Sequence, residues 1–169
     1  MTPDQKFIWK KIQQEDLDRY GSSFPFSERL AHENRWSPSY TARVIDEYKR
    51  FCFLSVVCGH PVTPSVAVDE AWHLHLLYSD HYWNFWCPEI LGRELHHGPT
   101  RGGADEAAKF DDWYRKTLLS YANFFSQAPP EDIWPGPESR GRTPIPIKVD
   151  PKQHWIIPKP RFLQRRTTR

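Results

Sequence analysis

Proline is concentrated at one end of this chain, and its distribution limits what the chain can fold into. Nine of the 16 prolines lie in residues 127–169. Because proline fixes φ and removes a backbone donor, neither a long helix nor a central strand can persist at this density. We therefore place a boundary near Ser126, between a helical domain over residues 1–126 and an extended, proline-rich tail over residues 127–169.

Charge changes at the same boundary. The domain holds 14 Lys and Arg against 17 Asp and Glu, whereas the tail holds 9 against 4. The tail also carries apolar residues, which we expect to anchor it around Ile133–Trp134 and Trp155–Ile157, on the domain, a second subunit or a protein partner. Its modest charge and few interleaved aromatic residues argue against dedicated nucleic-acid binding.

Apolar residues in the domain recur every three or four positions, and no alternating strand pattern is present. We expect five helices, over residues 2–20, 27–34, 37–58, 64–86 and 104–125. Hydrophobic residues make up only 38% of the chain, but 15% of all residues are aromatic and can each bury a large area. The sequence therefore predicts an all-α fold, a small helical bundle with a long loop containing His and Gly before the last helix.

Other features indicate the compartment. The chain has no run of about 18 apolar residues, and residues 1–6 contain no hydrophobic signal core. Cys52 and Cys58 would lie about 9 Å apart along one helix, too far for a disulfide. We therefore expect a soluble cytoplasmic protein with reduced thiols and no membrane association.

The predicted helix 64–86 carries the polar residues of greatest interest. On a regular helix, four of them share one narrow stripe: Asp69, His73, Asp80 and Asn84. Trp72 lies on the apolar side, so we expect it in the core. A polar stripe on a buried helix needs partners, because an unpaired buried polar group costs about 1 to 3 kcal/mol.

Asp69 and His73 are one helical turn apart, the spacing that places two metal ligands on one face. A protein metal site takes three or four ligands, and His96 and His97 on the following loop are natural donors. Imidazoles with a carboxylate suit zinc, iron or manganese. We therefore predict a divalent metal site made of Asp69, His73, His96 and His97.

The remaining histidines of this region receive other roles. His75 points to the side of a regular helix opposite His73, so the two cannot bind one ion. We expect His75 to be structural or, together with Asp80, to lie in the second shell of the site. For His81, beside Asp80, we expect a place on the free surface.

The segment from Val68 to Tyr78, preceded by a Tyr- and Phe-rich helix at residues 48–53, resembles the domain shared by plant and bacterial glycine-rich domain-containing proteins. The likeness covers roughly Tyr40 to Phe125 and rests on an Asp-x-x-Trp-His-x-His motif. It implies a short, stand-alone bacterial-type member, because this chain has only eight glycines and no glycine-rich segment. The resemblance implies no particular reaction. It makes four residues family features: Asp69, Trp72, His73 and His75.

Two functions from different classes follow. In the first, the chain is a metal-binding protein, and an enzyme if an open coordination position activates water or oxygen. In the second, it is a non-catalytic protein interaction module whose His and Asp residues form a structural hydrogen-bond network. No nucleophile elbow or phosphate-binding loop is present. The catalytic residues and the substrate therefore stay open at this point.

Overall fold

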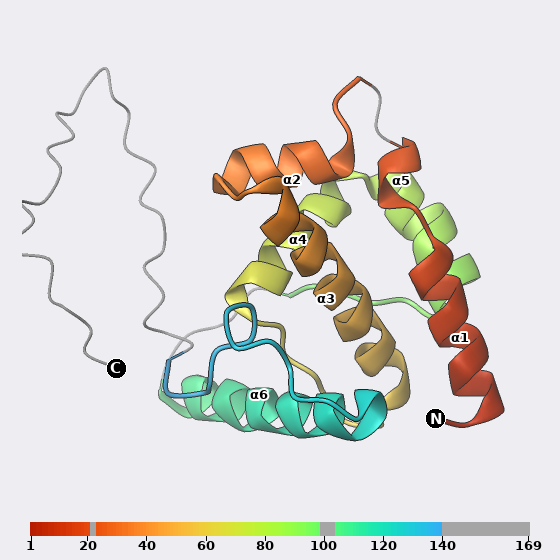
Figure 1. Cartoon of the computed structure of the whole chain (residues 1–169). Helices are drawn as coiled ribbons and strands as arrows, with labels where there is room; N and C mark the ends of the chain where they lie inside the picture. Colours follow the sequence, from red (N-terminus) through yellow and green to blue (C-terminus); the bar gives the residue numbers. More distant parts are fainter. Residues whose placement is uncertain (21–22, 99–103, 140–169) are drawn as a thin grey trace, which may run out of the picture.

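The computed structural model describes residues 1–20, 23–98 and 104–139, and every regular element within them is a helix (Figure 1). In chain order the elements are α1 (Pro3–Gln14), the 3₁₀ helix η1 (Leu17–Tyr20), α2 (Phe26–Asn34), α3 (Pro38–Val57), α4 (Val66–Leu77), α5 (Ser79–His81), the π-helix η2 (Tyr82–Leu91) and α6 (Ala104–Phe125). The all-α fold predicted from the sequence is confirmed. Across the described ranges, each helix is too short or too polar to span a bilayer.

Side chains fix the starts of the major helices. At α1, the Thr2 hydroxyl accepts a hydrogen bond from the backbone N–H of Gln5, and the Gln5 side chain accepts one from the backbone N–H of Thr2. Ser37 caps α3 and Ser65 caps α4 in the same position. These caps satisfy backbone donors that the first helical turn leaves unpaired. The α3 and α4 starts therefore lie where the sequence predicts them.

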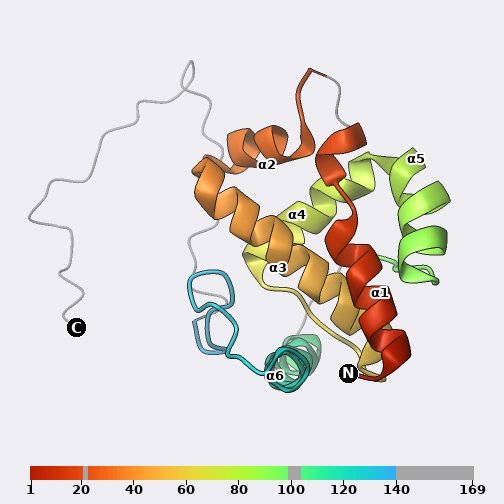
Figure 2. The same cartoon turned by 45° about the vertical axis from the view of Figure 1, so that its right-hand side comes forward.

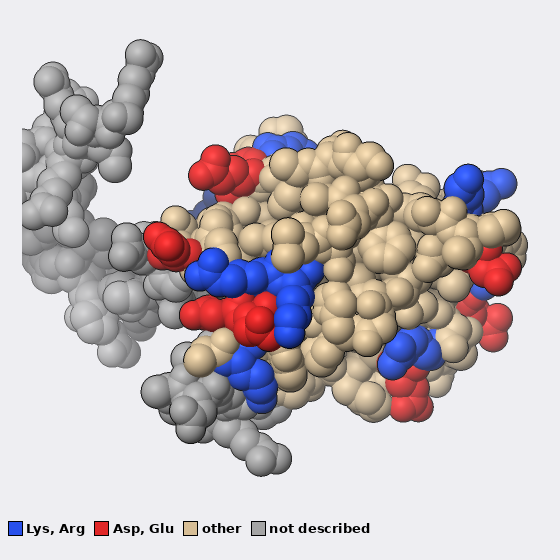
Figure 3. Space-filling model, turned by 90° about the horizontal axis from the view of Figure 1, so that it is seen from below, with Lys and Arg blue, Asp and Glu red and all other residues tan. Residues whose placement is uncertain are grey.

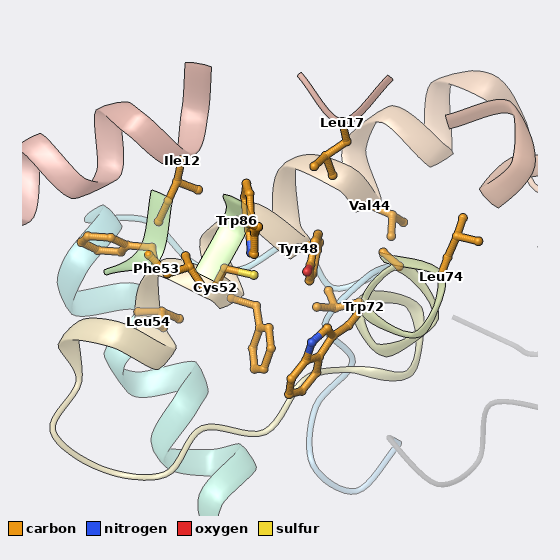
Figure 4. Packing of buried hydrophobic residues seen from close by; sticks show 14 of the residues in the cluster. Ile12, Leu17, Val44, Tyr48, Cys52, Phe53, Leu54, Trp72, Leu74 and Trp86 are labelled. Carbon is orange, nitrogen blue, oxygen red and sulfur yellow. The ribbon is translucent and has the colours of Figure 1, made fainter. Parts of the chain in front are cut away.

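Helix α3 lies at the centre of the bundle. In Figures 1 and 2, α2 crosses its N-terminal end, α6 runs beneath its C-terminal end, and α1 lies along its side. Figure 4 shows the core that this arrangement encloses, with Tyr48, Cys52 and Phe53 of α3 surrounded by residues such as Trp72 and Trp86. The three cysteines are free thiols. Large aromatic side chains therefore form much of the interior, as the composition predicts.

Two predicted helices are too long. The helix expected over residues 2–20 ends at Gln14, because Glu15 takes an extended conformation with φ −68° and ψ 128°, and the separate helix η1 follows. The continuous helix expected over residues 64–86 ends instead at Leu77, and Tyr78 takes a non-helical conformation with φ −83° and ψ 54°. Contacts with α2 hold this break, because the Tyr78 ring packs on Phe26 at 5.7 Å and its hydroxyl accepts a hydrogen bond from Arg29. The chain then continues through α5 into the π-helix η2, whose turns are wider than those of an α-helix. Asp80 therefore does not continue the stripe of Asp69.

The described part of the predicted tail, residues 127–139, lies against the helices. Ile133 and Trp134 are buried, and the Trp134 indole donates a hydrogen bond to Glu47 of α3 at 2.9 Å. Tyr121 of α6 donates a second bond to the same carboxylate at 3.1 Å. Burial raises the pKa of Glu47, and these two donors, together with Arg50 at 3.5 Å, offset part of the cost of desolvating the carboxylate. The other expected anchor, Trp155–Ile157, lies outside the described residues.

Trp72 is 6% exposed, which confirms its predicted place in the core, whereas Trp83 is 38% exposed. This pair gives a matched test of burial. We expect Trp72→Ala to lower the free energy of unfolding by about 3 to 5 kcal/mol, because it empties a large volume inside the core. Trp83→Ala should cost less than about 1 kcal/mol. Urea denaturation measures both values, and equal costs would contradict the packing.

Candidate functional site

Three side chains from α4 and the loop after η2 meet at the surface. The Nε2 atom of His97 lies 3.0 Å from Oδ1 of Asp69, and Nε2 of His73 lies 3.8 Å from Oδ2. One nitrogen or oxygen atom from each of the three residues lies within 4.8 Å of the others. The His73 side chain is 50% exposed, Asp69 33% and His97 21%. The group is therefore open to solvent on one side.

The core holds the loop that carries His97. The Trp72 indole donates a hydrogen bond to the Tyr82 hydroxyl at 2.8 Å, and that hydroxyl donates to the backbone carbonyl of Leu95. The His97 ring also packs edge-on against Trp72, with 4.5 Å between the ring centroids. Trp72 therefore supports His97 directly, and through Tyr82 it fixes the backbone two residues earlier.

His96 is not brought to this group. Its Nε2 atom lies 2.8 Å from a carboxylate oxygen of Glu94, and its ring packs on Trp83 at 5.2 Å. Its side chain is 70% exposed. Neighbouring residues of a non-helical segment project in different directions, so only one of the two adjacent histidines can face Asp69. The sequence pattern alone does not show which of His96 and His97 faces Asp69.

The two residues expected in the second shell also lie elsewhere. His75 is 1% exposed and faces α3, on the opposite side of α4 from His73, as helical spacing predicts. Asp80 follows the break at Tyr78 and accepts a hydrogen bond from Asn84 at 2.7 Å. Neither residue belongs to the group of Asp69, His73 and His97.

A second, buried polar group forms behind α4. The Tyr48 hydroxyl lies 2.8 Å from Nδ1 of His75, and Nε2 of His75 lies 2.9 Å from Nδ1 of His81. Nε2 of His81 is in turn 3.6 Å from a carboxylate oxygen of Glu15. We call this row of four residues the buried histidine chain. It joins α3, α4 and α5 to the segment after α1.

The expected surface position of His81 is wrong, because the side chain is only 7% exposed. On one continuous helix, six residues would place His81 about 240° from His75. The break at Tyr78 folds the chain back and brings the two rings within 5.0 Å. The pairing depends on tertiary contacts of Tyr78, so the periodic pattern could not reveal it.

The two histidines of the buried histidine chain are held in the neutral form. Burial, with a smaller contribution from the neighbouring His81, lowers the pKa of His75 to about 3. Burial also lowers the pKa of His81, while Glu15 opposes that shift. If Tyr48 donates to Nδ1 of His75, then Nε2 of His75 carries the proton and donates to His81. Tyr48, His75 and His81 can therefore satisfy one another's hydrogen bonds with both imidazoles neutral.

Comparison with known proteins gives one finding about family and none about activity. A family model described as UCP032817-like matches residues 13–117, which include the whole of α2 to η2 as well as Asp69, His73 and His97. No curated protein matches the chain, and no solved structure does. The comparisons therefore assign the chain to a family and indicate no activity for it.

The buried histidine chain makes stability depend on pH. The folded pKa of His75 lies below its ordinary value near 6.5, so between about pH 6.5 and 3 the unfolded chain binds a proton that the folded chain does not. We expect the free energy of unfolding to be fully retained above pH 6.5. It should fall on acidification by about 1 kcal/mol or more per pH unit, as His75 and His81 both contribute.

Denaturation in urea at pH 7.5, 6.0 and 5.0 measures this slope. His75→Gln removes the titrating group and should flatten the slope, although it also destabilises the protein at every pH. The exposed His32 is the matched control, and His32→Gln should leave the slope unchanged. An unaltered slope in His75→Gln would show that other groups cause the pH dependence.

Proposed function

We propose that Asp69, His73 and His97 of this member of the UCP032817-like family bind one divalent metal ion. The description of the family states no activity, so the proposal rests on the geometry of these three residues. The observation that carries this proposal is the convergence of three metal-ligating groups from two separate elements. The helix α4 supplies Asp69 and His73, and the loop that follows η2 supplies His97.

The distances fit an ion at the centre of the group. Zinc binds imidazole nitrogen and carboxylate oxygen at about 2.0 to 2.2 Å, which separates two tetrahedral ligands by about 3.4 Å. The Asp69–His97 and Asp69–His73 distances of 3.0 and 3.8 Å bracket that value. The two distances run to different oxygens of Asp69, and one ligand atom from each of the three residues lies within 4.8 Å of the others. Side-chain rotations that shorten the longest of these separations would place all three ligands on one ion.

The donor set narrows the choice of metal. Two imidazoles and one carboxylate make up the protein ligands of many catalytic zinc sites and of the non-haem iron centres that activate oxygen. Both kinds of site leave coordination positions open, and the half-exposed His73 places this site at the solvent. We propose zinc, iron or manganese as the metal. A metal held there would lower the pKa of a water molecule bound at an open position and would support hydrolytic or oxidative chemistry.

The proposal also concerns the glycine-rich domain-containing proteins. We propose that the likeness of the Asp-x-x-Trp-His-x-His motif extends to the roles of its residues. Asp69 and His73 are the ligands, Trp72 supports the third ligand, and His75 anchors α4 to α3. The motif then combines two ligands of the surface metal site with the buried Tyr48–His75 hydrogen bond that orients α4.

A second function is favoured by one specific observation. The Asp69–His97 contact at 3.0 Å is already a good hydrogen bond without an ion, so it can hold the loop to α4 by itself. In that case the site is a structural network of a non-catalytic interaction module. This function predicts that Asp69→Asn destabilises the protein and that added metal has no effect on its melting temperature.

Metal analysis of the full-length protein tests the first function. We expect about one equivalent of zinc, iron or manganese in protein purified without chelator, and a higher melting temperature with metal than without. His73→Ala should weaken metal binding at least tenfold, measured by calorimetry, because it removes one of three ligands.

His96→Ala is the matched control, since it deletes an adjacent loop histidine that bonds to Glu94 instead. It should bind metal as the wild type does. Absence of metal from the wild type, together with no calorimetric binding of zinc, iron(II) or manganese, would refute the metal function. An equal loss in His73→Ala and His96→Ala would refute the proposed ligand set.

A further inference from the structure

A groove of about 1340 Å³ lies between α2 and α3, on residues that neither the metal site nor the buried histidine chain uses. Its apolar lining includes Phe24, Trp36 and Ile45, all partly exposed. Apolar surface collected in a concave site is typical of a place where another group packs. The groove therefore has the shape and lining to receive a segment with apolar side chains.

The charge of the groove is predominantly negative. Five carboxylates line it: Asp18, Glu28, Glu33, Asp46 and Glu70. Arg35 is the one Lys or Arg among the described residues of its lining. By contrast, Figure 3 shows a face seen from below on which basic and acidic side chains lie beside one another. The groove thus favours a ligand that carries several positive charges along with apolar groups.

The sequence contains such a segment. Residues 140–169 lie outside the described residues, and they hold nine Lys and Arg against one Asp. They also carry Trp155, Ile156 and Ile157 in succession, between the lysines at 152 and 159. A net charge of +8 with an apolar centre is complementary to an acidic groove with an apolar lining. The charge and the apolar lining of the groove are therefore both complementary to residues 140–169.

The described residues shortly before this segment are held close to the groove. Asp132 accepts two hydrogen bonds from Arg43, at 2.6 and 2.9 Å, and its backbone carbonyl accepts one from the Tyr40 hydroxyl. The Tyr40 ring packs on Trp36, which lines the groove, with 5.2 Å between the centroids. Thirty residues can extend for about 100 Å, so chain length sets no barrier to reaching it.

We propose that residues 140–169 dock in the α2–α3 groove of their own chain. Lysine and arginine side chains of the segment pair with the exposed carboxylates at the rim, namely Glu28, Asp46 and Glu70. The Trp155–Ile157 stretch packs on the apolar lining. The proposal is independent of metal binding, because its surface includes none of the three ligands.

Zero-length carbodiimide cross-linking of the full-length protein tests the docking, since it joins a lysine only to a carboxylate in contact with it. We expect Lys148, Lys152 and Lys159 to couple to groove carboxylates and the yield to fall at high salt. A mixture of ¹⁴N- and ¹⁵N-labelled protein separates links within one chain from links between two copies. Links chiefly between copies, or chiefly to carboxylates outside the groove, would overturn the proposal.

A charge-reversal variant sharpens the test. Glu28→Lys with Asp46→Lys should lower the yield of tail links to the unchanged Glu33 and Glu70 at least fivefold. The control carries the same charge change outside the groove, as Asp4→Lys with Asp111→Lys, and should keep the wild-type yield. Circular dichroism checks that both variants are folded. Equal yields in the two folded variants would show that the groove charges do not hold the segment.

Discussion

The hydrogen bond between Tyr48 and His75 is the contact on which the rest of the structure depends. It lies inside an aromatic core, where an unpaired hydroxyl or imidazole would cost about 1 to 3 kcal/mol. This cost fixes the rotation of α4 against α3, because only one rotation brings His75 to Tyr48. His73 is two residues earlier and projects from the opposite side of the helix, so the same rotation sends it to the surface. A buried bond thereby decides which face of α4 carries Asp69 and His73.

The break at Tyr78 determines where the loop that carries His97 lies, and so positions the third residue of the site. It lets the chain fold back so that His81 reaches His75, and it starts the wide helix η2 at Tyr82. The Tyr82 hydroxyl then holds Leu95, and the loop places His97 beside Asp69. The exposed group of three thus rests on a rigid support of buried aromatic residues. Such support is what a binding site requires if its ligands are to stay in position.

Glu47 shows a different use of a buried polar group. Its carboxylate receives hydrogen bonds from Tyr121 of α6 and from Trp134, so one side chain of α3 holds two elements that lie far along the chain from it. The raised pKa of Glu47 reflects the burial that this position imposes. The fold therefore joins distant segments through polar groups on its central helix as well as through apolar packing.

Local patterns sufficed for several features of the structure. The serine and threonine caps, the three-and-four spacing of apolar residues and the proline density act within a few residues of the chain. They predicted the helical class, the starts of α3 and α4 and the burial of Trp72. Helical spacing also predicted that Asp69 and His73 share a face and that His75 lies opposite them.

The choice between His96 and His97, the end of α4 at Leu77 and the pairing of His75 with His81 were decided only in the tertiary structure. Each depends on a contact between residues of different elements, such as Tyr78 with α2 or Tyr82 with the loop before His97. Periodicity describes one segment at a time and carries no information about such contacts. The sequence by itself thus determined which residues share a face within one helix, such as Asp69 and His73, and packing determined where the helices end and which faces meet.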